Sequence, residues 1–143
     1  MTAPSTGEVP AGRLHVVEPA TADRGPTART VDIVMDEVPE IEGKPNAGFS
    51  YGIGPTVDSH GIVLARGRFA PNGAVTPHRT ANLYIVQVVR GSGRLDLYDT
   101  GGKARPVQVA NGDTVVLPAG TLHRWVSGDE PFEFVGIECT APQ

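Results

Sequence analysis

Residues 112–127 form the segment that most restricts what this chain can fold into. The segment reads Gly-Asp-Thr-Val-Val-Leu-Pro-Ala-Gly-Thr-Leu-His-Arg-Trp-Val-Ser, which is an apolar run of strand length, a turn at Pro118 and Gly120, and a second apolar run. Proline pre-sets a turn angle and glycine permits backbone conformations that a side chain would obstruct, so two strands joined by a tight turn are expected. Side chains alternate across a strand, so His123, Trp125 and Ser127 are expected on one face.

The rest of the chain repeats this pattern of short apolar runs between turns. The 18 glycines and 13 prolines are typical of many turns, and no long segment has the apolar stripe of a helix. About ten short strands at such spacing favour an all-β sandwich or barrel. The expected strands lie near residues 31–35, 48–53, 61–70, 75–80, 83–90, 94–98, 105–109, 114–117, 121–127 and 132–139.

The length of 143 residues fits one domain with a real hydrophobic core. Residues 1–30 are rich in Ala, Pro, Thr and Gly, and only Leu14 to Val17 resemble a strand. We therefore expect residues 1–30 to be a flexible or strand-swapping arm and residues 31–143 to be the single barrel domain.

The segment 112–127 resembles the second motif of the cupin superfamily, G-x5-P-x-G-x2-H-x3-N, at every fixed position except the last, where Ser127 replaces Asn. The resemblance implies a cupin-type jelly-roll β-barrel over about Gly61 to Thr140, with a small-molecule site inside it. It also implies a homodimer, in which the N-terminal strands cover edges that a small barrel leaves open.

A segment upstream, residues 73–91, resembles the first cupin motif less closely. His78 falls on a ligand position of that motif, whereas Thr80 stands where a second histidine belongs and Tyr84 stands where a glutamate belongs. Two of the four usual metal ligands of the family are therefore replaced. If no bulge intervenes, His78, Thr80 and Tyr84 share the inward face that the motif implies.

The resemblance marks His78, Tyr84 and His123 as candidate catalytic residues. With a metal, His78 and His123, and Tyr84 as a possible third ligand, would hold a divalent iron or zinc ion weakly, because catalytic sites usually have three protein ligands. Without a metal, an imidazole beside a phenol can move a proton at a carbon next to a carbonyl. Two structural histidines and a barrel-lining tyrosine are the simpler alternative.

Four further residues are candidates for substrate binding. Thr80 shares the face of His78, and Trp125 is either an apolar wall for a flat substrate or a core tryptophan. Arg66 and Arg68 share one face of a strand and would bind a carboxylate or polar ketone if that face points inward; otherwise they are surface arginines.

Charge and composition exclude several partners. The formal net charge of −4 and the scattered basic residues give no pull toward nucleic acid. One cysteine, no signal-like N-terminus and no apolar stretch of membrane-spanning length favour a cytoplasmic protein without a membrane partner.

The function we expect is non-redox acid/base chemistry on a ring-containing or polyketone metabolite, meaning isomerisation, cyclisation or dehydration. Small cupin polyketide cyclases and isomerases of secondary metabolism resemble this arrangement. The first alternative is a metal-dependent oxygenase, with a third ligand from Tyr84, His60 or Glu138. The second is a cupin that binds a small molecule without catalysis.

Overall fold

The computed structural model describes residues 9–54 and 61–140, which form strands and contain no helix. None of these segments is therefore a helix of the kind that crosses a membrane. The strands are β1 (Val9–Glu18), β2 (Thr27–Glu37), β3 (Glu40–Ile41), β4 (Lys44–Pro45), β5 (Ala47–Gly54), β6 (Ile62–Ala74), β7 (Leu83–Arg90), β8 (Ser92–Tyr98), β9 (Ala104–Ala110), β10 (Thr114–Leu117), β11 (His123–Ser127) and β12 (Phe132–Cys139).

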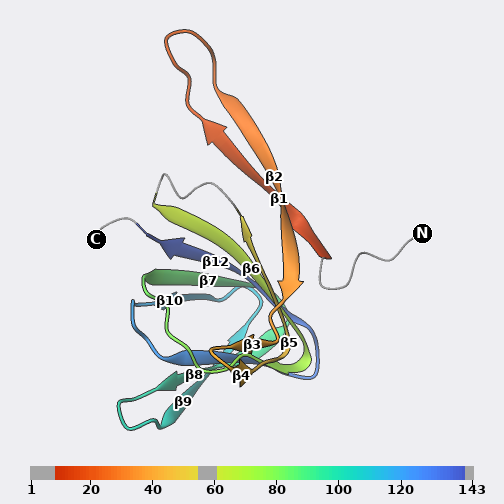
Figure 1. Cartoon of the computed structure of the whole chain (residues 1–143), viewed down its shortest axis with the longest axis vertical. Coiled ribbons are helices and arrows are strands. Elements are labelled where there is room, and N and C mark those ends of the chain that lie inside the picture. The colour runs from red at the N-terminus through yellow and green to blue at the C-terminus, as the bar shows by residue number, and fades with distance from the viewer. Residues whose placement is uncertain (1–8, 55–60, 141–143) are drawn as a thin grey trace, which may run out of the picture.

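The strands curl into a barrel, which confirms the all-β expectation (Figure 1). The main sheet runs in the order β1-β2-β5-β6-β11-β8-β9, with β12 pairing both β6 and β7, and β10 pairing β7. Strand β6 connects three other strands of the sheet, because it pairs with β5, β11 and β12. All these pairings are antiparallel, so short turns suffice to connect many of the strands.

The N-terminal strands form a hairpin that extends beyond the barrel (Figure 1). Strand β1 pairs with β2 from Val9↔Met35 to Glu18↔Thr27, so it is longer than the Leu14 to Val17 segment expected from sequence. Residues 1–8 of the expected arm lie outside the described residues.

The prediction of a strand at residues 75–80 is wrong. Strand β6 continues to Ala74, and the following residues form only an isolated bridge between His78 and His123. Pro77 explains the difference, because proline lacks the N–H that a regular ladder requires and fixes its own backbone angle.

A small hairpin that the sequence analysis did not predict lies between β2 and β5. Strands β3 and β4 are joined by Glu42 and Gly43, whose φ angles are 51° and 77°. Two successive positive φ angles are the signature of a tight type I′ turn. Ile41 of this hairpin packs against the barrel core.

The core fills the barrel interior with side chains that alternate along the strands. On β11, His123, Trp125 and Ser127 are buried and the residues between them are only partly so, which confirms the face expected from sequence. The buried cluster consists of Phe69, Val75, Tyr84, Val86, Val88, Leu95, Val109, Leu117, Trp125, Phe132 and Phe134.

Gly67 on β6 is required by the packing of this core. Its Cα lies opposite Phe134 of β12, and a Cβ at this position would overlap the Phe134 ring. The aromatic ring therefore occupies the volume that any other residue at position 67 would need.

We predict that Gly67→Ala lowers the free energy of unfolding by about 1–3 kcal/mol, the usual cost of overpacking a core. Urea denaturation of the variant measures this loss. Gly128→Ala is the matched control, because nothing lies within 4 Å of a Cβ built there. Equal stability of the two variants would contradict this account of Gly67.

Candidate active site

A cavity of about 240 Å³ lies inside the barrel. It holds five of the seven candidate site residues, which confirms that β7, β11 and the segment before β7 converge. The lining residues are Val38, Ile41, Phe49, Tyr51, Val75, His78, Thr80, Tyr84, His123, Trp125, Phe134 and Glu138.

The two histidines are held side by side by their own backbones. The N–H of each donates to the carbonyl oxygen of the other, at 2.9 and 3.0 Å, and the ring centroids are 4.6 Å apart. These bonds place both imidazoles at the cavity although they come from distant parts of the sequence.

The two imidazoles are oriented by the same local device. The Nδ1 of His78 lies 2.9 Å from the carbonyl oxygen of Thr76, and the Nδ1 of His123 lies 2.9 Å from that of Thr121. A carbonyl only accepts, so each Nδ1 carries the proton of the neutral ring. Each Nε2 consequently keeps a lone pair for a proton, a ligand or a substrate donor.

His123 is the more buried of the pair. Its side chain is 1% exposed, and its Nε2 is buried with no hydrogen-bond partner. Burial lowers the pKa of His123 to about 4, against the opposing effect of the hydrogen bond to Thr121, and the neighbouring His78 lowers it further. His123 is therefore neutral at physiological pH and acts as an acceptor.

Two tyrosines form a hydroxyl pair in the cavity. The Tyr51 and Tyr84 hydroxyl oxygens are 2.9 Å apart. Burial is the main cause that raises the pKa of both phenols, and the nearby Glu138 carboxylate adds to it. Both phenols stay protonated, so after one donates to the other, one hydroxyl hydrogen is still free to donate to a substrate oxygen.

Trp125 is a core residue that also lines the cavity. In the core cluster its ring stacks on that of Phe134, with the ring centroids 5.7 Å apart. At the cavity its ring meets that of His123 edge-on, with the centroids 6.3 Å apart. Thr80 lines the cavity as well, but its hydroxyl donates to the Asn82 carbonyl oxygen at 2.9 Å.

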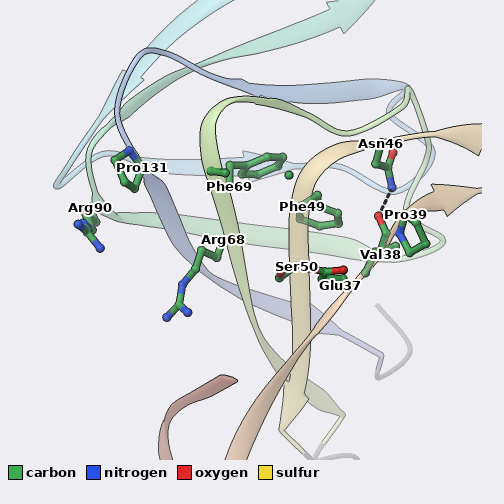
Figure 2. Close-up of a pocket in the computed structure, with 12 residues that line it drawn as sticks. Glu37, Val38, Pro39, Asn46, Phe49, Ser50, Arg68, Phe69, Arg90 and Pro131 are labelled. Carbon is green, nitrogen blue, oxygen red and sulfur yellow. Dashed lines mark hydrogen bonds between the residues drawn. The ribbon is translucent and has the colours of Figure 1, made fainter. Parts of the chain in front are cut away.

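Arg66 and Arg68 do not line the cavity, so the expectation that they bind its substrate is not supported. On β6 they alternate with the buried Ala65, Gly67 and Phe69, which puts them on the outer face. Arg68 pairs with Glu133 at 2.6 Å and lines an outer depression of about 630 Å³ (Figure 2).

Ser127, which replaces the Asn of the second cupin motif, forms hydrogen bonds with the backbone of β6. Its hydroxyl accepts from the Gly73 backbone N–H at 2.7 Å and donates to the Ala70 carbonyl oxygen at 2.6 Å. The side chain thereby joins two backbone positions near the C-terminal end of β6, a few residues before His78.

Sequence reasoning missed Tyr51 and the repeated Thr-x-His spacing. The Thr76–His78 and Thr121–His123 pairs are visible in the sequence and explain the orientation of both rings. Tyr51 gave no such signal, because its place beside Tyr84 depends on the pairing of β5 with β6.

The donor set does not complete a metal site. Two neutral imidazole nitrogens carry no charge, and a phenol with a raised pKa is a poor ligand. Glu138 lies in the cavity but accepts a hydrogen bond from Asn82, and His60 lies outside the described residues. Among the described residues, no three His, Cys, Asp or Glu side chains are arranged to hold an ion, so the set does not fit a tightly held metal.

The sequence profile of the family described as Cupin matches residues 54–143. The chain therefore belongs to the cupin family, and the jelly-roll barrel expected from the two motifs is confirmed. No curated protein matches the sequence.

Solved structures that are similar in fold include the following three. A cupin-2 domain protein of Rhodospirillum rubrum is 18% identical, with a TM-score of 0.61 over 76% of this chain and 72% of that chain. The polyketide cyclase RemF from Streptomyces resistomycificus is 22% identical, with a TM-score of 0.62 over 76% of this chain and 75% of that chain. An oxalate oxidase is 24% identical, with a TM-score of 0.58 over 68% of this chain and 54% of that chain.

We predict that the purified protein holds less than one metal ion per chain, because two neutral ligands retain an ion weakly. Elemental analysis before and after dialysis against a chelator measures the content. His78→Ala and His123→Ala should each release whatever ion is present. Stoichiometric iron or zinc that survives the chelator would contradict the prediction.

The lowered pKa of His123 also predicts a loss of stability in acid. The unfolded histidine takes up a proton near its ordinary pKa of 6.5, whereas the folded one does so only at about 4. The free energy of unfolding is therefore highest above the unfolded pKa. It falls as the pH drops from the unfolded pKa to the folded one, by up to about 3 kcal/mol.

Urea denaturation over this pH range tests the assignment, with His123→Gln as the matched variant. The variant has no titrating group at this position, so its stability should fall less as the pH drops. A fall as large in His123→Gln as in the wild type would show that another group causes it.

Proposed function

We propose that this cupin is an enzyme that catalyses a non-redox acid/base conversion, an isomerisation, cyclisation or dehydration, of a ring-containing or polyketone metabolite. The observation that carries the proposal is the fixed orientation of the two histidines. Each Nδ1 is bound to a threonine carbonyl, so both Nε2 lone pairs are left beside a hydroxyl pair in a largely apolar cavity.

The two histidines have different roles in this proposal. His123 is a weak base, because burial lowers its pKa to about 4, and it accepts a hydrogen bond from a substrate hydroxyl or enol. The half-buried His78 is the general base, and its Nε2 takes a proton from the carbon next to a carbonyl.

Tyr84 completes the step. As the carbon proton moves to His78, the electron pair of the broken C–H bond moves into the new carbon–carbon double bond and negative charge develops on the carbonyl oxygen. The Tyr84 hydroxyl, paired with Tyr51, donates to this oxygen and stabilises the enolate. The His78 imidazolium then returns the proton to another carbon or to a departing hydroxyl, so the reaction consumes no oxidant or reductant.

The cavity supports a flat, mainly apolar substrate. Trp125 and Phe134 supply aromatic walls, and the volume of about 240 Å³ is small for a ligand pocket. The fold shared with the polyketide cyclase RemF is consistent with this class. The sequence-based expectations of a cytoplasmic homodimer and of a place in secondary metabolism belong to the same proposal.

Exchange of α-protons for deuterium in β-tetralone, a flat bicyclic ketone, tests the proton transfer by NMR in deuterated water. His78→Ala should lower the catalysed rate by roughly 10² to 10⁴, the range for loss of one proton-transfer group. Tyr84→Phe should slow the rate while leaving KM almost unchanged, because its hydrogen bond strengthens as charge develops. Trp125→Ala should mainly raise KM, because it removes a wall.

His15→Ala is the matched control, since His15 is exposed on the N-terminal hairpin and bonds only to Thr30 among the described residues. Its rate should equal that of the wild type. Unchanged exchange in both His78→Ala and Tyr84→Phe would end the acid/base assignment. Binding of β-tetralone without any exchange would favour the ligand-binding alternative, and consumption of O₂ that depends on added iron would favour the oxygenase.

A further inference from the structure

Asn46 connects the small β3–β4 hairpin to the backbone that carries His78. Its side-chain Nδ2 donates to the Val38 carbonyl oxygen at 2.9 Å, which Figure 2 shows as a dashed line, and its backbone N–H donates to the Pro39 carbonyl oxygen at 2.8 Å. Its Oδ1 accepts from the backbone N–H of Thr76 at 2.7 Å. One side chain thus holds both the start of the hairpin and the segment before β7.

The bond to Thr76 matters because the orientation of His78 depends on the same residue. The Thr76 carbonyl oxygen accepts from the His78 Nδ1. The peptide unit that contains this carbonyl ends in Pro77, which has no N–H to anchor it. The Asn46 bond just upstream is therefore the side-chain contact that fixes this carbonyl.

The matching carbonyl for His123 is fixed differently. The Thr121 backbone N–H and hydroxyl both donate to the Pro118 carbonyl oxygen, at 3.3 and 2.8 Å, within one turn. The side-chain contact that fixes the Thr121 carbonyl is therefore local, whereas the Thr76 carbonyl is fixed through a residue from another part of the chain.

The hairpin that Asn46 holds forms one wall of the cavity. Val38 and Ile41 both line the cavity, and the Val38 N–H is bound to the Phe49 carbonyl oxygen at 2.9 Å. Val38 and Phe49 also line the outer depression, so this wall separates the cavity from the outside. A ligand that fills the cavity touches the hairpin and the His78 ring together.

We propose that Asn46 is a positioning residue that couples the β3–β4 hairpin to His78. By holding Thr76 and the hairpin at once, it keeps the His78 Nδ1 bound to its carbonyl, so that Nε2 faces the cavity while the hairpin covers it. The proposal rests on the proposed function only for the use that the enzyme makes of the His78 Nε2.

The tautomer of each histidine, measured by heteronuclear NMR on nitrogen-labelled full-length protein at about pH 8, tests this coupling without any substrate. Asn46→Ala removes both side-chain bonds. The ratio of the Nδ1–H to the Nε2–H form of His78 should then fall by roughly fivefold, the change that one ordinary hydrogen bond produces. The His123 ratio should stay unchanged, which makes it an internal control against general loosening.

Asn46→Asp separates the two bonds. A carboxylate still accepts from Thr76 but cannot donate to Val38, so the His78 tautomer should be retained while amide hydrogen exchange of the β3–β4 hairpin becomes faster. Asn111→Ala, at an exposed turn where the Asn111 backbone N–H donates to the Gly91 carbonyl oxygen, should change neither measurement.

An unchanged His78 tautomer in Asn46→Ala would overturn the proposal, and so would equal shifts in His78 and His123. If Asn46→Ala does not fold, loss of the His78 tautomer in the folded Asn46→Asp variant would overturn it instead. These NMR results do not depend on turnover. A failure of the β-tetralone assay with the expected tautomer shift would therefore count against the proposed function and leave the positioning role of Asn46 supported.

Discussion

The two backbone hydrogen bonds between His78 and His123 are the constraint on which the site depends. Regular pairing of β6 with β11 is confined to Val126 and Ala74, and the His78–His123 bridge extends the contact between the two segments beyond the end of β6. It brings together two rings that no local interaction could join. The threonine carbonyl two residues before each histidine then fixes the ring, so position comes from tertiary pairing and orientation from the local chain.

The burial of the groups that line the cavity decides what they can do. Burial keeps His123 neutral and both tyrosines protonated, so these groups offer a nitrogen acceptor and a hydroxyl donor without charge, and the one carboxylate that lines the cavity, Glu138, is bound to Asn82. Hydrogen bonds are stronger in such surroundings than in water. The site is therefore better suited to stabilising charge that develops during a reaction than to holding a charged ligand or a cation.

The sequence predicted most of the barrel because its information is local. The turn at Pro118 and Gly120 and the two-residue period put His123 and Trp125 on one strand face, and the resemblance to the cupin motif implied that this face points inward, as the structure shows. The same period could have excluded Arg68, because its neighbour Phe69 is the stronger candidate for the inward position.

Other features of the site depend on contacts that a single sequence does not reveal. The β3–β4 hairpin has no alternating apolar pattern, and only Ile41 of its residues packs inward. Tyr51 and Asn46 gain their roles from the partners that β5 meets across space. Pro77 was the local signal that residues 75–80 would not form a regular strand, because proline has no N–H to donate to a ladder.

Trp125 gives the protein a built-in optical reporter. It is the only tryptophan in the chain, and its ring lies between the His123 imidazole and the Phe134 ring at the cavity wall. Indole emission responds to the polarity and the charge of its immediate surroundings, and light that excites tryptophan but not the three tyrosines gives a signal from this one place. Libraries of unlabelled compounds can consequently be screened for cavity occupancy by intrinsic fluorescence, with no dye and no background from a second indole.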